Sequence, residues 1–426
     1  MSRPSDLSSL VKLGALRRRH HFLRELRVLA LPILIAAVLQ AAIYAAVLVR
    51  GGRDDWDNFA ITAAVLALVP VMTASLLASM RQQEFTLTVP AVITVIVFNF
   101  AVAGLSAFRV PVSYVGLLLA AAPTVVIMVY ANVLLRRALS ERIGILVFPG
   151  ADELRAQLKG QPSIIAGPDD ELRSIDRVLI DGATHHSAEW SHFLTRLLMI
   201  GVEVTPWQKY METRLRKVDV ENFDILHLSY STSQILYSRA KRILDVAAAV
   251  VLAPLALVLC GLIAGYIWLL DGGPVIFRQP RRGYGGSTFT LYKFRTMYKN
   301  SGDRQVQAND SRILPGCRFL RLMRLDELPQ LVNILRGEMS WIGPRPVSLP
   351  IAEELEASFP QYAHRQLVLP GLTGWAQVSH QYAGNTEEEM EKLAYDLYYI
   401  KELSFDLDLL ILFKTAHILL SRRGAR

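Results

Sequence analysis

Four long apolar runs occupy the first third of the 426-residue chain. They cover residues 27–49, 59–80, 86–108 and 112–135, with short polar segments between them. Each run approaches the roughly 20 residues that an α-helix needs to cross about 30 Å of hydrocarbon. Four consecutive runs of this length are atypical of buried helices in a soluble domain. The pattern therefore predicts four transmembrane helices over residues 27–137.

Charged residues around these runs indicate an orientation. The predicted basic N-terminus, residues 1–26, and the segment after the fourth run are rich in arginine, whereas the first loop is acidic: Arg17, Arg18, Arg19, Arg24, Arg136, Arg137 and Arg142 against Asp54, Asp55 and Asp57. Cytoplasmic loops carry an excess of Lys and Arg. We expect both ends of the region on the cytoplasmic side, and a membrane-flanking role for the basic cluster rather than nucleic-acid contact.

Residues 138–236 show a different pattern, in which short apolar runs alternate with helix-like segments. Strands are predicted in "RIGILVF", "SIIAG", "RVLID" and "VEVTPW", and helices in "ADELRAQLKG" and "SAEWSHFLTRLLMIG". This alternation is typical of a small, Rossmann-like parallel α/β domain. The first turn reads "FPGADE" instead of GxGxxG, so no dinucleotide site is predicted and a regulatory or scaffolding role is expected. His185 and His186 lack ligand spacing and are interpreted as surface residues.

A fifth apolar run, residues 241–273, contains Pro254 near its middle. Basic residues flank both of its ends: Arg239, Lys241 and Arg242 before, and Arg278, Arg281 and Arg282 after. A re-entrant helix over about residues 241–270 that breaks at Pro254 keeps both clusters on one side; a kinked spanning helix is the alternative. Asp245 is expected to pair with Lys241 or Arg242 near the membrane surface.

Composition narrows the class of protein. With 52% hydrophobic and 20% charged residues and a net charge of +8, the chain is unlike disordered, collagenous or disulfide-stapled proteins. Its two cysteines, Cys260 and Cys317, form no metal-binding spacing. Two unpaired thiols are expected.

The candidate chemistry lies after residue 275. Adjacent carboxylates, Asp326 and Glu327, precede Pro329 in a helix-like run that Gly337 ends. One interpretation is a capped helix start without catalytic function. However, several arginines surround the pair: Arg318, Arg321, Arg324, Arg336 and Arg345. This favours a phosphate site, where a carboxylate beside phosphates is a typical Mg²⁺ ligand.

Two glycine-containing segments flank this pair. "GGPVIFRQPRRGYGGSTFTLYKFRTM" carries Lys293 and Arg295, and is interpreted either as a hairpin with a solvated basic face or as a diphosphate cradle. "LPGLTGWAQV" contains Trp375 and is either a structural corner or a wall for a base or sugar.

Several ordered strings together resemble the bacterial polyprenyl-phosphate phosphoglycosyltransferases, which initiate exopolysaccharide and O-antigen synthesis. The strings are "KRILDV", "GGPVIFRQPRRG", "LYKFRTM", "ANDSRI", "LDELPQLVNILRGEMS", "IGPRP", "PGLTGWAQV" and "KLAYDLYYIKELSFDLDLLILFKT". The four N-terminal runs and the middle domain resemble the long polytopic form of this family. The resemblance implies a mostly helical catalytic domain over residues 237–426.

The resemblance also implies an activity and site residues. Sugar 1-phosphate would pass from a UDP-sugar to polyprenyl (undecaprenyl) phosphate and release UMP, as the first membrane step of exopolysaccharide or O-antigen assembly. Asp326 would be the nucleophile that forms a covalent phosphosugar intermediate, and Glu327 its Mg²⁺-binding partner. Arg345 would contact the nucleotide or a phosphate. Lys293, Arg321 and Asp396 lie at further motif positions, and with Arg295 they complete the expected substrate-binding set.

Two positions depart from the family pattern. Ala253 stands before Pro254 where the family often has Ser, so the bend would depend on Pro254 alone. "VSLP" follows "GPRP" where a charged residue is usual, which leaves local substrate contacts open.

The family implies a multi-pass protein of the bacterial inner membrane with a cytoplasmic catalytic domain. The expected partners are the UDP-sugar, polyprenyl phosphate, membrane lipid and a second copy in a homodimer, with no nucleic acid. The alternative is a membrane sensor or scaffold with a degenerate catalytic region, against which the intact "LDELPQ" and "PRP" strings argue.

Overall fold

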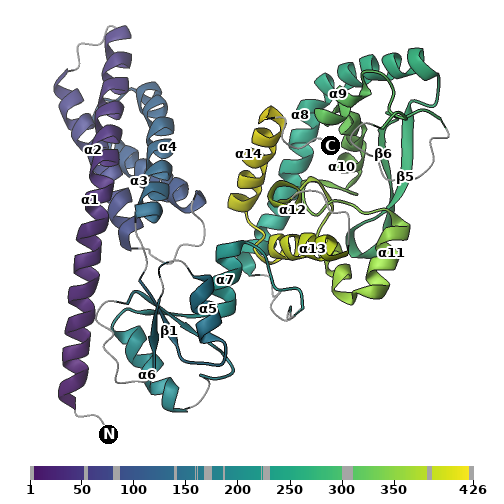
Figure 1. Cartoon of the computed structure of the whole chain (residues 1–426). Helices are drawn as coiled ribbons and strands as arrows, with labels where there is room; N and C mark the ends of the chain where they lie inside the picture. The colour runs from purple at the N-terminus through teal and green to yellow at the C-terminus, as the bar shows by residue number, and fades with distance from the viewer. Residues whose placement is uncertain are drawn as a thin grey trace. The chain divides into compact units, whose positions relative to one another are not determined.

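The structure is a computed structural model of the whole chain (Figure 1). It describes residues 4–51, 56–79, 87–138, 142–158, 160, 162–166, 175–185, 188–221, 223, 231–299, 310–380 and 386–421. The chain divides into two compact units, Met1–Met211 and Glu212–Arg426.

Unit 1 begins with four apolar helices. They are α1 (Pro4–Arg50), α2 (Trp56–Ser79), α3 (Thr88–Ala107) and α4 (Tyr114–Ala138). Helix α1 packs against α2 and α4, and the bundle core includes Tyr44, Leu66 and Leu117. The basic N-terminal segment continues directly into the first apolar run as one helix of 47 residues. With α8 of unit 2, the described residues hold five helices that are long and apolar enough to cross a membrane, which indicates a membrane protein.

Unit 1 also contains the expected parallel sheet. Its strands are β1 (Ile143–Leu146), β2 (Ser163–Ile165), β3 (Arg177–Ile180) and β4 (Glu203–Pro206), in the order β2-β1-β3-β4. All three strand pairs are parallel. The connecting helices are α5 (Ala151–Gln157) and α6 (Ala188–Met199), and α7 (Trp207–Leu215) follows β4. The α/β prediction for this region is confirmed.

His185 is not a surface residue, so that interpretation was wrong. It is only 4% exposed, and its Nδ1 lies 2.9 Å from the carbonyl oxygen of Asp181. Its ring meets Trp190 edge-on at 4.8 Å between centroids. The turn after β3 folds the imidazole back among aromatic rings, which a lone polar letter in the sequence does not show. His186 lies outside the described residues.

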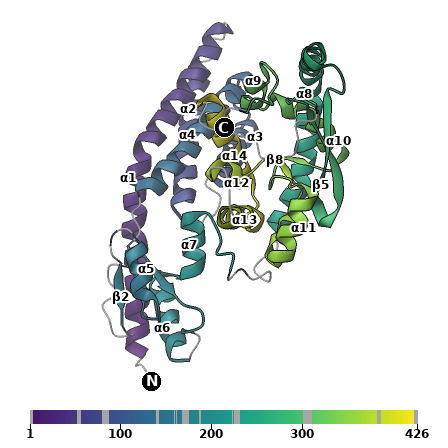
Figure 2. The ribbon, with the colours of Figure 1, turned by 45° about the vertical axis from the view of Figure 1, so that its right-hand side comes forward.

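Unit 2 is mostly helical, with two small sheets. Helix α8 (Thr232–Asp271) leads into the antiparallel hairpin β5 (Ile276–Arg282) and β6 (Thr288–Phe294), joined by the 3-10 turn η2 (Tyr284–Gly286). The following elements are α9 (Cys317–Leu322), η3 (Leu325–Gln330), α10 (Leu331–Arg336), β7 (Ser340–Ile342), α11 (Leu349–Ser358), η4 (Pro360–Leu367), β8 (Gly371–Thr373), α12 (Trp375–Ser379), α13 (Thr386–Lys401) and α14 (Phe405–Ser421). Strands β7 and β8 pair in parallel, and Figure 2 shows α11 beside β5.

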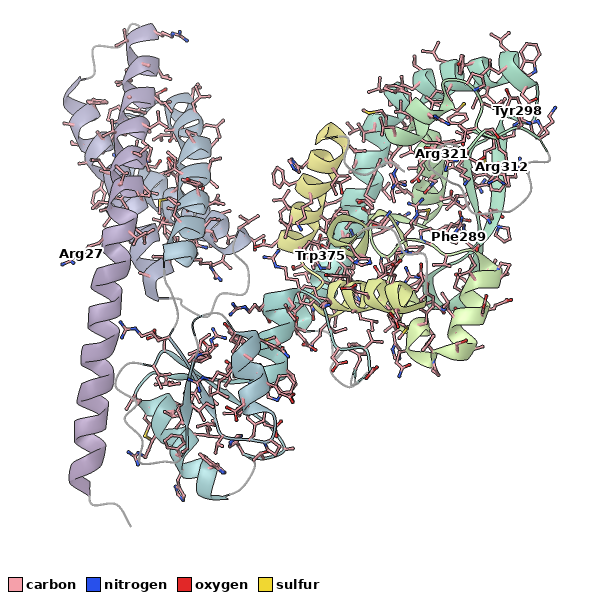
Figure 3. The ribbon with its side chains drawn as sticks, in the orientation of Figure 1. Arg27, Phe289, Tyr298, Arg312, Arg321 and Trp375 are labelled. Atoms are coloured by element: carbon pink, nitrogen blue, oxygen red, sulfur yellow. The ribbon has the colours of Figure 1, made fainter. Side chains whose placement is uncertain are left out.

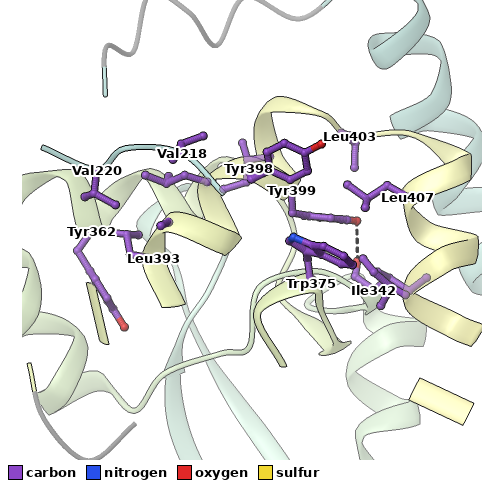
Figure 4. Packing of buried hydrophobic residues seen from close by; sticks show 14 residues of the cluster. Val218, Val220, Ile342, Tyr362, Trp375, Leu393, Tyr398, Tyr399, Leu403 and Leu407 are labelled. Atoms are coloured by element: carbon purple, nitrogen blue, oxygen red, sulfur yellow. Dashed lines mark hydrogen bonds between the residues drawn. The ribbon is translucent and has the colours of Figure 1, made fainter. Parts of the chain in front are cut away.

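The main core of unit 2 lies between α12, α13 and α14 (Figure 4). Tyr399 is buried there, and its hydroxyl contacts the carbonyl oxygen of Ile342 at 3.2 Å and the Asp408 carboxylate at 2.8 Å. Val218 and Val220 pack into the same core. The domain boundary expected at residues 236/237 therefore lies inside this unit.

Helix α8 is continuous through Pro254 and begins earlier than the expected start at residue 241. Ser231 caps its N-terminus in a capping box with Gln234, and Gly272 ends it at a φ of +62°. Figure 1 shows the helix bending part-way along. A proline removes one hydrogen bond, which bends a helix that packing holds on one face. Helix α8 is therefore not interrupted at Pro254, unlike the break expected from the sequence.

The two sides of α8 differ sharply. Ala249, Ile263 and Ile267 are buried against the rest of unit 2, whereas Val251 and Leu269 are both 77% exposed. Cys260 on this helix and Cys317 are free thiols, as expected.

Candidate functional site

The two adjacent carboxylates lie on η3, a 3-10 turn and not the first turn of an α-helix. Arg324 precedes the turn with a φ of +56°, a left-handed conformation that is uncommon for a residue with a Cβ. Helix α10 follows and ends at Gly337, whose φ is +85°. Asp326 and Glu327 are both buried. The tight turn thus places two neighbouring carboxylates inside the protein.

Two arginines hold Glu327. Arg324 Nη1 donates to its Oε1 at 2.9 Å, and Arg345 Nη2 donates to the same oxygen at 2.8 Å. Burial alone would raise the pKa of this carboxyl, but the two guanidiniums outweigh burial and lower its pKa to about 2. Glu327 is therefore ionised throughout the physiological range. The residue with the left-handed backbone, Arg324, is thus also one of the two that bind the Glu327 carboxylate.

Asp326 has the opposite electrostatic environment. Burial and the charge of Glu327 raise its pKa to about 6, against the lowering effect of Arg321 and Lys293. Its Oδ1 is buried and has no hydrogen-bond partner among the described residues. A carboxylate without such a partner keeps its lone pairs for another atom. The pair therefore combines one fixed anion and one reactive carboxylate.

Cations surround the pair. A small pocket beside Glu327 is lined by Arg281, Leu291, Lys293, Gln330, Arg345 and Pro346. Burial and the nearby Arg345 lower the pKa of Arg281 to about 10, and burial and Arg281 lower the pKa of Lys293. Arg321, labelled in Figure 3, contacts Thr296 Oγ1 at 3.4 Å. Positive charge exceeds negative charge here, which suits a diphosphate.

The turn η3 packs against α8. Leu325 and Leu328, which flank the carboxylates, lie against a cluster that includes Ile263 and Ile267 of α8. Phe294 of β6 and Leu314 belong to the same cluster. The carboxylate pair is thus attached to the inward face of the long apolar helix.

Three other expected site residues occupy different places. Arg295 donates to the carbonyl oxygen of Gly272 at 2.7 Å and pairs with Asp271 at 3.2 Å, so it holds the C-terminal end of α8. Asp396 is 1% exposed and pairs with Arg365. Arg336, expected beside the carboxylates, lies instead over the Tyr292 ring.

The N-terminal half of α8 is tied to unit 2 by polar groups. Asp245 Oδ1 accepts from the backbone N–H of Trp341 at 3.4 Å, and Lys241 pairs with Asp408 at 2.6 Å. Arg242 donates to the carbonyl oxygens of Ile334 at 2.7 Å and Leu335 at 3.2 Å. In place of the expected pairing within α8, Asp245 accepts from β7, Lys241 pairs with α14 and Arg242 donates to the C-terminal end of α10. Asp245 and Lys241 therefore contact groups that are distant in sequence instead of the neighbouring turn of α8.

Trp375 is part of a structural corner and not a wall of the site. It is buried, its Nε1 donates to the carbonyl oxygen of Arg216 at 2.8 Å, and Lys414 lies 4.6 Å from its ring. A Cβ at Gly374 would lie 2.2 Å from the carbonyl oxygen of Gly343. The glycines of "PGLTGW" therefore permit a close backbone crossing.

Sequence reasoning missed Arg365 of η4. Its guanidinium contacts the Asp396 carboxylate, the Tyr362 hydroxyl and the carbonyl oxygen of Arg345. None of the sequence motifs contains this residue. Its partners come close to it through the packing of η4 on α13.

Comparison with known proteins assigns the family. A family model described as bacterial sugar transferase matches residues 236–422. The UDP-glucose:undecaprenyl-phosphate glucose-1-phosphate transferase of Caulobacter vibrioides is 42% identical over 190 residues, which cover 43% of this chain and 71% of the relative. The chain belongs to the bacterial sugar transferase family. The matched segment contains every residue of the bacterial sugar transferase site described above.

Two further bacterial relatives match a similar or greater length of the chain. The UDP-N-acetylgalactosamine-undecaprenyl-phosphate N-acetylgalactosaminephosphotransferase of Aeromonas hydrophila is 38% identical over 243 residues, or 56% of this chain and 57% of the relative. An uncharacterised sugar transferase of Bacillus subtilis is 37% identical over 185 residues, or 43% of this chain and 89% of the relative. The match thus spans little more than half of the Aeromonas protein but most of the Bacillus one.

Proposed function

We propose that this protein transfers a sugar 1-phosphate from a UDP-sugar to polyprenyl phosphate and releases UMP. One observation carries the proposal: a buried carboxylate pair, ringed by cations, is packed on the inward face of a membrane-type helix. Such a site suits a soluble phosphorylated donor and a lipid phosphate acceptor. The names of the Aeromonas and Caulobacter relatives support this choice of acceptor.

In this proposal Asp326 is the nucleophile. With a pKa of about 6 it is ionised at neutral pH, and its Oδ1 has no hydrogen-bond partner among the described residues. The carboxylate oxygen attacks the β-phosphorus of the donor, the bond from that phosphorus to the bridging oxygen breaks, and UMP leaves with the electron pair. An oxygen of polyprenyl phosphate then attacks the phosphosugar phosphorus and releases the Asp326 carboxylate.

The cations stabilise charge on the transferring group. Lys293 and Arg321 lie close enough to Asp326 to lower its pKa, so they also face a phosphorus bound to it. Arg281 and Lys293 line the adjoining pocket and suit the donor's phosphates.

The residues of the site could hold a magnesium ion only if the substrate supplied further ligands. Glu327 is a permanently ionised carboxylate whose two arginines both use Oε1, and within the described ranges there is no group of three potential ligand side chains. Mg²⁺ commonly takes one or two carboxylates and completes its shell with phosphates and water. Glu327 would hold the ion, which would neutralise phosphate charge.

We further propose that α8 is re-entrant. Its N-terminal half is tied to α10 and β7 through Arg242 and Asp245, and its C-terminal half donates from the Tyr266 hydroxyl to the carbonyl oxygen of Pro315 at 3.0 Å. A straight helix of 40 residues would be about 60 Å long, so a bend lets both halves pack on one domain. In this topology the catalytic unit and the N-terminus are cytoplasmic, at the bacterial inner membrane.

The topology has a direct test. A single cysteine at Lys299, which is exposed, is placed in a chain where Cys260 and Cys317 are replaced by serine. Maleimide reagents that do not cross the membrane should label it only after the inner membrane is opened. Labelling of intact spheroplasts would show that α8 spans the membrane.

The activity is tested by UMP release from the full-length protein in nanodiscs with polyprenyl phosphate. UDP-glucose, UDP-galactose and UDP-N-acetylhexosamines are compared, because the Aeromonas and Caulobacter relatives are named for different sugars. Without acceptor, donor labelled in the β-phosphate should leave label on Asp326, and chelation of Mg²⁺ should stop turnover. Product formation without any adduct in a rapidly quenched reaction would contradict the nucleophile. Mass photometry of the same sample tests the expected homodimer.

A further inference from the structure

The loop after β7 is held by its backbone carbonyls. Pro344 and Pro346 flank Arg345 and have no backbone N–H to donate, so their segment cannot form a regular ladder. The carbonyl oxygen of Pro344 accepts from Gly371 N at 2.9 Å, that of Arg345 from Arg365 Nη2 at 3.1 Å, and that of Pro346 from Arg281 Nη1 at 3.0 Å. Three consecutive carbonyls are thus fixed, two of them by guanidinium groups.

Arg365 is itself fixed by Asp396. Its Nε and Nη2 lie 2.8 and 2.7 Å from Asp396 Oδ2, and its Nη1 donates to the Tyr362 hydroxyl at 2.7 Å. Asp396 is buried and Arg365 is mostly so, with side-chain exposures of 2% and 12%. A buried ion pair contributes only when its remaining donors are also satisfied, and here one of them is satisfied by the loop that carries Arg345.

Arg345 lines the small pocket beside Glu327 and a second pocket, which Arg282, Pro344, Tyr362 and Arg365 also line, and Asp396 lines neither of them. The Asp396 carboxylate contacts Arg365 Nε and Nη2, and the same Nη2 donates to the carbonyl oxygen of Arg345. The Arg345 side chain then reaches Glu327 Oε1 at 2.8 Å. A continuous series of contacts thus runs from α13 to the carboxylate pair.

We propose that Asp396 and Arg365 are positioning residues for the transfer reaction: they fix the backbone of Arg345 so that its guanidinium stays on Glu327. This inference rests on the proposed function. It assigns Asp396 no contact with either substrate, in contrast to the substrate-binding role expected from the sequence.

A double-mutant cycle tests this role in the full-length protein. Asp396→Asn should lower kcat/KM for the donor by roughly 10- to 100-fold, because small displacements of a positioned group have effects of this size. In an Arg345→Ala background the same substitution should change kcat/KM by less than about threefold, since the group that it positions is gone. A general structural role would give the same factor in both backgrounds. That result would overturn the proposal.

The matched control is another ion pair on α13. Lys401 of this helix pairs with Glu212 of α7 at 2.6 Å, with side-chain exposures of 17% and 19%, and among the described residues no polar contact joins this pair to the loop of Arg345. Glu212→Gln should have the same small effect on kcat/KM in both backgrounds. Thermal unfolding of every variant shows whether Asp396→Asn folds. If it does not, Arg365→Lys replaces it, since lysine keeps the charge but cannot reach Asp396 and the Arg345 carbonyl together.

The UDP affinity of the four proteins in the cycle is also measured by calorimetry. This measurement gives a result even if turnover in the Arg345→Ala background is too slow to detect. Coupling between the two sites in UDP affinity supports the positioning role, and additive effects contradict it. If the wild-type protein released no UMP from any donor, the proposed function would fail. A wild type that turns over while the cycle is additive would remove only the positioning role.

Discussion

The five apolar helices are of two kinds. In α1–α4 between 28% and 39% of each span is buried, and the helices pack on one another. In α8 only 17% is buried, and its buried face meets η3, α10 and β7, the elements around the carboxylate pair. Hydrophobic length alone does not distinguish them. The two kinds differ in what the inward face contacts: other apolar helices for α1–α4, and the elements around the carboxylate pair for α8.

The polar side chains of the apolar helices also differ between α1–α4 and α8. The bundle buries the side chains of Gln40, Thr62 and Thr73 among its own helices. Helix α8 instead uses Arg242, Asp245 and Tyr266 to bind backbone groups of the catalytic unit. The first arrangement holds a bundle together, whereas the second attaches α8 to the unit that carries the carboxylate pair. Substitutions in the two regions should therefore differ in what they change.

The largest effect is expected at Asp326. Asp326→Asn should lower UMP release by roughly a thousandfold or more, because an amide oxygen is a poor nucleophile. The same substitution should raise the melting temperature at pH 7.5. The folded-state pKa of about 6 lies above the ordinary value of 3.8, so the folded protein binds the proton more tightly and ionisation destabilises it. This cost corresponds to at most about 3 kcal/mol.

The pH dependence of stability tests whether ionisation of Asp326 destabilises the folded protein. Measured in EDTA, the stability difference between variant and wild type should grow as pH rises from about 4 to about 6 and then stay constant. Asp406→Asn on α14 is the matched control and should change neither turnover nor this difference. Wild-type turnover by Asp326→Asn would remove it as the nucleophile.

Glu327→Gln should have the next largest effect, a loss of roughly 10²- to 10³-fold in kcat. In the wild type kcat/KM should rise with pH through the pKa of Asp326, near 6, whereas Glu327, with a pKa of about 2, stays ionised over this range. The charge of Glu327 raises the pKa of Asp326. Its removal should therefore move the acidic limb of kcat/KM to lower pH. A limb that stays in place, or moves to higher pH, would contradict this electrostatic account.

Some of these features could be predicted from the sequence and others could not. Periodicity predicted the apolar helices and the parallel sheet, because each signal is local: about 20 apolar residues, or short strands between helices. It also predicted that Asp326 and Glu327 would be surrounded by cations. Spacing could not predict which cations. Arg295 lies two residues after Lys293 yet holds the end of α8, while Lys293 acts on Asp326.

The missed features all depend on contacts between distant segments. Pro254 indicated a broken helix, but packing on one face of α8 keeps the helix continuous. The contact of Asp396 with Arg365, which lies 31 residues earlier in the chain, could not be seen in the motifs. The sequence likewise did not show that the carboxylates lie on a 3-10 turn instead of the start of an α-helix. Tertiary structure decides such cases.

A smaller effect is expected at Arg242, with Arg27 as its counterpart in the bundle. Arg27 stands at the start of the first apolar run and is exposed, and Figure 3 shows its side chain pointing away from α1. Arg242 donates to two carbonyls at the end of α10. Arg242→Gln should lower turnover by about tenfold and reduce the melting temperature, because hydrogen bonds from charged groups contribute about 1.5–3 kcal/mol. Arg27→Gln should leave both unchanged, and equal losses from the two variants would refute the distinction between the helices.

The smallest effect on the chemical step should come from the removal of unit 1 altogether. All residues of the proposed site lie after residue 280, and the match to the Bacillus relative covers 89% of that protein, which leaves it little room for a region like residues 1–211. A protein beginning at Glu212 keeps Val218 and Val220 for the core of unit 2 and retains all of α8 as its membrane anchor. Its UMP release in nanodiscs should stay within about threefold of the full-length rate per folded molecule, because unit 1 contributes none of the proposed site residues. A start at residue 237 would instead remove both valines and the first turn of α8, so that protein should lose stability. If the protein beginning at Glu212 folds but loses more than about tenfold in turnover, unit 1 contributes to catalysis and the two kinds of apolar helix are not functionally separate.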